Sequence, residues 1–139
     1  MKKFTISIFV TLILLVSCST KAQNDTKDEV TKEAQGNVFL VLSPEEFDAK
    51  LDMETHPQLI DVRTASEFNQ GSIPNAQNFD ILDGTFQKRL KTLDKTKPVF
   101  VFCAKGGRSG KASNILKESG FTSVLDLKGG YTAWRSSHP

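Results

Sequence analysis

Cysteine and histidine are scarce in this chain of 139 residues, and no charge of one sign dominates it. The two cysteines and two histidines do not have the spacing of metal ligands, so we expect neither a metal site nor a cofactor. Lys2 and Lys3 account for the formal net charge of +2. The rest of the chain is balanced, which gives no electrostatic reason to expect nucleic acid as a partner.

No apolar run is long enough to cross a bilayer. The run from Phe4 to Val16 is shorter than the roughly 20 residues that a transmembrane helix needs. It follows Lys2 and Lys3 and has the length of the apolar part of a signal peptide. It ends at Leu15-Val16-Ser17-Cys18, which resembles the lipobox of bacterial lipoproteins. In that family the cysteine becomes the first residue of the mature chain and carries lipid on its sulfur.

This resemblance implies a division of the chain into three parts. Residues 1–17 are expected to be a lipoprotein signal peptide, residues 18–37 a lipidated Cys18 with a polar, flexible tether, and residues 38–139 the folded domain. Anchoring through lipid places the protein in the bacterial cell envelope, most simply facing the periplasm. It also excludes a disulfide between Cys18 and Cys103, because the Cys18 sulfur is already a thioether. A plain secretory signal with an incidental cysteine is the alternative.

Apolar runs alternate with amphipathic stretches along the predicted domain. Strands or extended segments are expected at 38–42, 59–62, 73–79, 99–102 and 121–127, and helices at 43–51, 64–68, 83–93, 109–119 and 129–134. Residues 99–102 are β-branched or aromatic at every position, which indicates a central strand buried on both faces. This order predicts an α/β fold with a mainly parallel central sheet flanked by helices. Ligands of such sheets bind beyond the carboxyl ends of the strands.

The residue that follows the predicted central strand is Cys103, in the segment Cys103-Ala104-Lys105-Gly106-Gly107-Arg108-Ser109. Gly106 and Gly107 allow a turn whose amides point inward as an anion-binding nest. The following helix start, Lys105 and Arg108 add positive charge. Together these groups should lower the pKa of the thiol and hold an anionic substrate or a persulfide. A buried, inert cysteine is the alternative, but it would not require two glycines and two cations nearby.

Three motifs, in the correct order, resemble the rhodanese family. The segment from Cys103 to Ser109 matches its active-site loop, C-x-x-G-x-R-S. Residues 59–63 and 67–76 resemble its first signature, D-V-R followed by E-[FY]-x-x-G-H-I-P-G-A, with Ser72 and Asn75 in place of the usual His and Gly. Gly129-Gly130 with Trp134 resembles its closing motif.

The resemblance implies a rhodanese-like fold and a single-domain sulfurtransferase. Sulfane sulfur would pass from thiosulfate or a persulfide donor to cyanide or a thiol through a Cys103 persulfide. The amides from Ala104 to Ser109 would bind the substrate. With Cys18 lipidated, the acceptor must come from outside the chain. A sulfur-carrier or redox-sensing module of the envelope with little turnover is the alternative, and an envelope scaffold is a third possibility.

Loop length separates this family from its phosphatase relatives. Arg108 stands five positions after Cys103, giving C-x4-R, whereas the related phosphatases have C-x5-R and a wider cradle. This spacing disfavours phosphatase or arsenate reductase activity. Arg108 has two interpretations: it binds the anionic end of the donor, or it braces the loop. Lys105 is interpreted as attracting substrate rather than as a plain surface lysine, and Ser109 as a helix cap with a possible bond to sulfur.

The remaining residues of the signatures are expected to be architectural. The family match implies that Asp61 holds the loop by hydrogen bonds and that Arg63 supports it. Arg63 and Glu67 are four positions apart and are expected to pair at a helix start. Trp134 is expected to lie in the core.

Overall fold

The computed structural model describes residues 36–139. The predicted signal peptide, Cys18 and nearly all of the predicted tether lie outside the described residues. Within 36–139, no helix combines the length and the apolar character that crossing a bilayer would require.

A five-stranded, all-parallel sheet forms the centre of the domain, in the order β1-β5-β4-β2-β3. Its strands are β1 (Val38–Leu42), β2 (Gln58–Asp61), β3 (Gln77–Asn78), β4 (Val99–Phe102) and β5 (Ser123–Leu127). The predicted central strand is therefore β4, which lies between β5 and β2. Every residue of β4 is buried, as the unbroken apolar run indicated.

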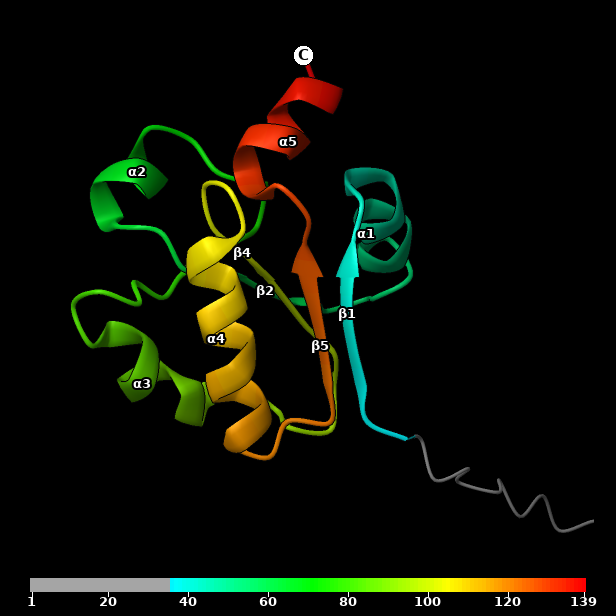
Figure 1. Cartoon of the computed structure of the whole chain (residues 1–139), viewed down its shortest axis with the longest axis vertical. Helices are drawn as coiled ribbons and strands as arrows, with labels where there is room; N and C mark the ends of the chain where they lie inside the picture. The colour runs from blue at the N-terminus through cyan, green and yellow to red at the C-terminus, as the bar shows by residue number, and fades with distance from the viewer. Residues whose placement is uncertain (1–35) are drawn as a thin grey trace, which may run out of the picture. The chain divides into compact units, whose positions relative to one another are not determined.

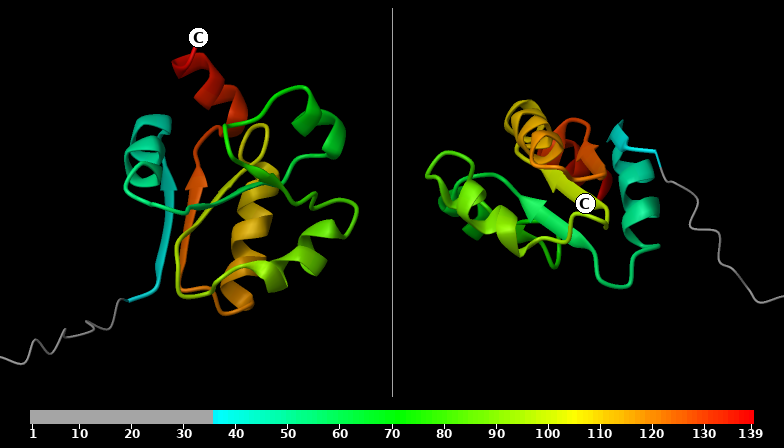
Figure 2. Two further views of the ribbon diagram at one scale, coloured as in Figure 1. Left: turned by 180° about the vertical axis from the view of Figure 1, so that it is seen from behind. Right: turned by 90° about the horizontal axis from the view of Figure 1, so that it is seen from below.

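Helices cover both faces of the sheet (Figures 1 and 2). They are α1 (Pro44–Leu51), α2 (Ala65–Asn69), α3 (Thr85–Arg89) with the 3₁₀ turn η1 (Leu90–Thr92), α4 (Gly107–Glu118) and α5 (Gly130–Ser137). One hydrophobic cluster packs α3, η1 and α4 against the sheet, and a second packs α1 and α5 against the opposite face. The expected α/β architecture is confirmed.

Successive residues of β4 contribute to opposite cores. Val99, Val101 and Cys103 belong to the α3–α4 side, whereas Phe100 and Phe102 belong to the α1–α5 side. The strand shows no polar alternation because neither face meets water. Cys103 thereby faces the side on which α4 begins.

Capping residues close in sequence determine where several of the helices begin. Ser43 and Thr64 cap α1 and α2, and each forms a reciprocal capping box with a glutamate three residues later. The segment from Asp83 differs from expectation: Gly84, in a left-handed conformation, holds the N-cap position of α3, and Asp83 instead accepts a hydrogen bond from the Thr85 amide at 2.7 Å. Of the expected extended stretch 73–79, only the two residues of β3 pair in the sheet.

Candidate active site

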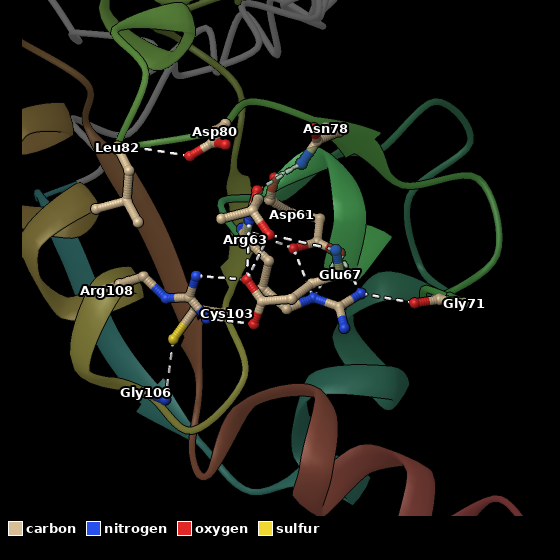
Figure 3. A network of polar contacts seen from close by, with 11 residues as sticks. Asp61, Arg63, Glu67, Gly71, Asn78, Asp80, Leu82, Cys103, Gly106 and Arg108 are labelled. Atoms are coloured by element: carbon tan, nitrogen blue, oxygen red, sulfur yellow. Dashed lines mark hydrogen bonds and ion pairs between the residues drawn. The ribbon is translucent and has the colours of Figure 1, made fainter. Parts of the chain in front are cut away.

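Cys103 directly follows β4 at the carboxyl edge of the sheet. The loop that joins β4 to α4 lies beside the start of α5 (Figure 1). The chain then turns through Gly106, whose φ of +104° is a left-handed conformation that glycine adopts without strain. The Gly106 amide donates to the Cys103 sulfur at 3.1 Å (Figure 3). Cys103 exposes only 1% of its surface, so the loop amides rather than bulk water surround its sulfur.

The ionisation of Cys103 reflects two opposing influences. Burial alone raises the pKa of the thiol. The amide and hydroxyl of Ser109 and the amides of Lys105 and Gly106 outweigh it, so the pKa of Cys103 lies below its ordinary value. The loop therefore favours the thiolate, which is the nucleophilic form of cysteine.

The start of α5 holds the beginning of this loop in place. The amide of Tyr131 donates to the Cys103 carbonyl at 2.7 Å, and that of Thr132 to the Ala104 carbonyl at 3.1 Å. Gly130 has a φ of +61°, and a Cβ there would stand 2.7 Å from the Ala104 carbonyl carbon. The closing Gly-Gly motif thus has a physical reason: only glycine lets α5 approach the loop this closely.

Arg108 is held by a carboxylate from another element. Its guanidinium donates two hydrogen bonds of 2.6 Å to the two carboxylate oxygens of Glu67 (Figure 3). This bidentate contact is the main cause that lowers the pKa of Glu67 to about 2. The contact with Glu67 likewise raises the pKa of Arg108, to which the negative charge of Cys103 adds. Of the two interpretations of Arg108, the structure shows the bracing contact.

The expected pair between Arg63 and Glu67 is wrong. Arg63 precedes the N-cap of α2, so the two residues do not share one helix. Its guanidinium instead donates to both oxygens of Asp61, at 2.6 to 3.0 Å, and to the carbonyl of Gly71 at 2.7 Å. The capping-box pattern from Thr64 to Glu67 was the available signal, because it turns the glutamate back toward the helix start.

Asp61 and Arg63 support the site less directly than expected. The Asp61 carboxylate accepts hydrogen bonds from Arg63 and from the Ser72 hydroxyl at 2.8 Å, and none from the Cys103 loop in the described part of the chain. The link to the loop runs through α5, because the Arg63 guanidinium stacks over the Tyr131 ring at 4.2 Å.

The two departures from the family signature have local explanations. Ser72 stands at the position of the usual histidine, and its hydroxyl donates a hydrogen bond to Asp61. Asn75 has a φ of +65°, and asparagine is one of the few residues that tolerate the left-handed conformation suited to glycine. Neither change reaches the Cys103 loop.

Ser109 is not a helix cap. Gly106 holds the N-cap position of α4, and Ser109 is the third residue of that helix. Its hydroxyl donates back to the Gly106 carbonyl at 3.0 Å. The helix begins two residues earlier than expected because Gly106 makes the turn itself. Ala104 is half-buried and Gly107 exposed within the same loop.

Lys105 is exposed at the loop, where it can meet an incoming anion. Trp134 is only half-buried: it packs beside the α1–α5 core and donates from Nε1 to Asp48 at 2.9 Å. Among residues 36–139 no group of histidine, cysteine, aspartate and glutamate side chains is arranged to hold a metal ion.

Comparisons with known proteins by sequence and by structure match this chain to the same family. The rhodanese-like domain family matches residues 43–137. A sulfurtransferase of Allochromatium vinosum is 36% identical over 76 residues, which cover 55% of this chain and 69% of that protein. Thiosulfate sulfurtransferase GlpE of Coxiella burnetii is 33% identical over 81 residues, covering 58% of this chain and 74% of the relative. The crystal structure of a rhodanese-like domain protein from Staphylococcus aureus matches with a TM-score of 0.62 at 30% identity, over 69% of this chain and 91% of that one.

Proposed function

Since the chain belongs to the rhodanese-like domain family, we propose that it is a sulfurtransferase that carries sulfane sulfur on Cys103 between thiosulfate or a persulfide and a cyanide or thiol acceptor. The observation that carries this proposal is the 3.1 Å hydrogen bond from the Gly106 amide to the Cys103 sulfur. A main-chain donor in that position stabilises negative charge on a thiolate and on the persulfide that replaces it.

The reaction proceeds in two balanced displacements. The Cys103 thiolate attacks the outer sulfur of thiosulfate, the S–S bond of the donor breaks, and sulfite leaves with the electron pair. Cyanide or an external thiolate then attacks the terminal sulfur of the persulfide and departs as thiocyanate or as a new persulfide. Cys103 regains its thiolate, so no outside oxidant or reductant is consumed.

The chain's own residues have distinct parts in this scheme. Lys105, exposed at the loop, attracts the anionic donor. Arg108 holds the loop through Glu67 and adds positive charge beside the sulfur. The amides of the loop keep the sulfur anionic while it waits for an acceptor.

The proposal is tested by incubating the purified full-length protein with thiosulfate and cyanide and measuring thiocyanate, beside Cys103→Ser and Lys105→Ala variants. We expect turnover that Cys103→Ser abolishes and Lys105→Ala weakens mainly through a higher KM for thiosulfate. Mass spectrometry should show one added sulfur on Cys103 after the donor alone. Added sulfur without turnover would support the carrier alternative, and neither result with any sulfane donor would contradict the proposal.

We also propose that Cys18 carries a lipid that anchors the protein in the bacterial cell envelope, facing the periplasm. The support is the lipobox-like sequence that ends in Cys18. Metabolic labelling with an alkyne fatty acid should label the protein and place it in the membrane fraction. Cys18→Ser should remove both label and membrane association, whereas Cys103→Ser should change neither; label retained in Cys18→Ser would contradict this anchor.

A further inference from the structure

One buried carboxylic acid close to the loop has no part in the scheme above. Asp126 lies in β5, where it pairs in register with Val101 of β4, two residues before Cys103. Its side chain points to the side covered by α4: a Cβ at Gly110 of that helix would be 4.0 Å from Asp126 Oδ2. The residue exposes only 6% of its surface.

One oxygen of the Asp126 carboxylate lacks the partner that a buried polar atom needs. Its Oδ1 atom is buried and has no hydrogen-bond partner within the described residues. Burial raises the pKa of Asp126 to about 6, although the Ser109 hydroxyl and the Leu127 amide counter part of this effect. A buried carboxyl oxygen without a partner, beside the helix that begins at the sulfur site, is an energetic cost that packing alone does not explain.

Ser109 connects this acid to the nucleophile. It is fully buried in the first turn of α4, and both its amide and its hydroxyl help to lower the pKa of Cys103. The hydroxyl has a single hydrogen, for which the Gly106 carbonyl at 3.0 Å, the Cys103 sulfur and the Asp126 carboxylate are alternative acceptors. An ionised Asp126 competes for that hydrogen, whereas a protonated Asp126 can donate to the hydroxyl instead.

Few other charges act on Asp126 from the surrounding elements. Phe39 and Val41 of β1, Gly110 and Ser113 of α4, and Val124 of β5 line the shallow hollow of about 260 Å³ that Asp126 borders. None of them titrates. On the side of the sheet covered by α4, the ionisable groups are Cys103 after β4 and, on α4, Arg108, Lys111, Lys117 and Glu118; Lys128, which follows β5, is exposed. Of these, Arg108 is held by Glu67, Lys117 lies over the Phe39 ring at 5.1 Å, and Lys111 and Glu118 are exposed.

We propose that Asp126 is a positioning residue for sulfur transfer, which sets the reactivity of Cys103 through Ser109 and through its own charge. This inference rests on the proposed role of Cys103 as the sulfur carrier. With Asp126 neutral, the Ser109 hydrogen stays with the loop and the thiolate is favoured. With Asp126 ionised, a second negative charge lies close by and disfavours both thiolate and persulfide anion. An isolated thiol becomes more reactive as the pH rises, because more of it is thiolate. Ionisation of Asp126 opposes this rise at Cys103, so the reactivity of Cys103 exceeds that trend at pH values below the Asp126 titration.

The size of the charge effect follows from the strand geometry. Adjacent strands and a two-residue offset separate the two side chains by roughly 8 Å. At that separation and an effective dielectric constant of about 20, removing the charge should raise the fraction of Cys103 present as thiolate by roughly tenfold or more at pH values below the thiol pKa. This is large enough to resolve by alkylation kinetics.

The test uses the full-length chain carrying Cys18→Ser, so that Cys103 is the sole thiol. Its alkylation by iodoacetamide is followed from pH 4 to 9 for this parent and for Asp126→Asn and Glu118→Gln. The parent rate should rise less steeply through pH 6. Asp126→Asn should lose that change of slope. Above pH 7, and as long as the thiol is not fully ionised, its Cys103 should react roughly tenfold faster than that of the parent. Glu118→Gln removes an equal charge from the far, exposed end of α4 and should behave as the parent.

Two results would overturn the inference. One is an Asp126→Asn profile that superimposes on that of the parent in a protein with unchanged circular dichroism. The other uses no variant of Asp126: carboxyl ¹³C NMR of the parent should show the Asp126 titration moving when Cys103 is alkylated, because coupling between two sites is reciprocal. A titration that stays in place would contradict the coupling even if Asp126→Asn does not fold. Alkylation needs no sulfur donor, so failure to load sulfur would count against the proposed function alone.

Discussion

At the scale of single residues, the site is a sulfur atom surrounded by donors that the main chain supplies. The chemistry of Cys103 depends less on the identity of its neighbours than on where their amides point, since three loop amides oppose the effect of burial on its pKa. The full charges act at a greater distance. Arg108 faces Glu67 and braces the loop, and Lys105 remains exposed for a ligand.

Replacing Glu67 by Gln tests the brace. The pair is partly exposed, at 25% and 33% of the two side chains, so its loss should lower the free energy of unfolding by only about 0.5–1 kcal/mol at neutral pH. The rate of sulfur transfer should fall by more than this small loss of stability explains, because a released Arg108 no longer fixes the loop. Urea unfolding and thiocyanate formation measure the two effects; Glu45→Gln, an exposed glutamate of α1, is the control.

The same pair predicts a pH dependence of stability. The pKa of Glu67 is lowered to about 2 in the folded protein, against 4.5 for a free glutamate. Its contribution is therefore complete above pH 4.5 and is lost as the pH falls from there toward 2. The unchanged chain should lose more stability over this range than Glu67→Gln, as urea midpoints at pH 6 and pH 3 would show. Equal losses in the two proteins would count against the pair.

At the scale of elements, the site forms where the N-terminal ends of three helices lie close together at one edge of the sheet. The turn before α4 and the first turn of that helix supply the amides around the sulfur, α2 presents Glu67 to Arg108, and α5 donates hydrogen bonds to the carbonyls of Cys103 and Ala104. A parallel sheet makes this possible, because every strand ends and every following helix begins at the same edge.

Replacing Gly130 by Ala should disrupt the close contact between the start of α5 and the Cys103 loop. The new Cβ would overlap the Ala104 carbonyl, in addition to the strain of a φ of +61°. Gly84→Ala is a matched control, because Gly84 has a φ of +79° but nothing within 4 Å of the added Cβ. We expect a cost of about 1–2 kcal/mol for Gly84→Ala with sulfur loading retained. Gly130→Ala should cost more and lose sulfur loading, as urea unfolding and mass spectrometry of Cys103 would show; equal behaviour would exclude a role for the close approach.

At the scale of the whole domain, β4 joins two hydrophobic cores that lie on opposite faces of the sheet. Phe100 packs edge-on against Phe47 of α1, with ring centroids 5.4 Å apart, and Val101 packs on the α4 side. Because one short strand belongs to both cores, neither should unfold alone.

Truncations on the two faces of β4 test this unity. Phe100→Ala should cost about 3–5 kcal/mol and Val101→Ala less, in line with the smaller volume removed. Both variants should unfold in one transition with an unchanged urea dependence, monitored together by tryptophan fluorescence and circular dichroism. Two separated transitions would show that the cores are independent. The exposed Val41→Ala in β1 should cost little by comparison.

Local sequence determined much of this protein. The unbroken apolar run at 99–102 predicted the buried central strand, and the C-x4-R loop with its two companion motifs predicted the family. Helices were expected from residues 43 and 64, which are the N-caps of α1 and α2. These features depend on backbone preference and on neighbours within a few positions, so a sequence contains them directly.

Only the tertiary structure decided which charges meet. Arg108 pairs with Glu67 across 41 positions, Arg63 turns to Asp61, and Asp126 of β5 faces α4 with one carboxylate oxygen that has no partner within the described residues. The expectation for Arg63 and Glu67 was wrong because Arg63 precedes the N-cap of α2 and its guanidinium bonds to Asp61 of β2 instead. Partners of this kind are set by the order and register of the strands, which bring distant residues to one edge, and no local pattern records that order.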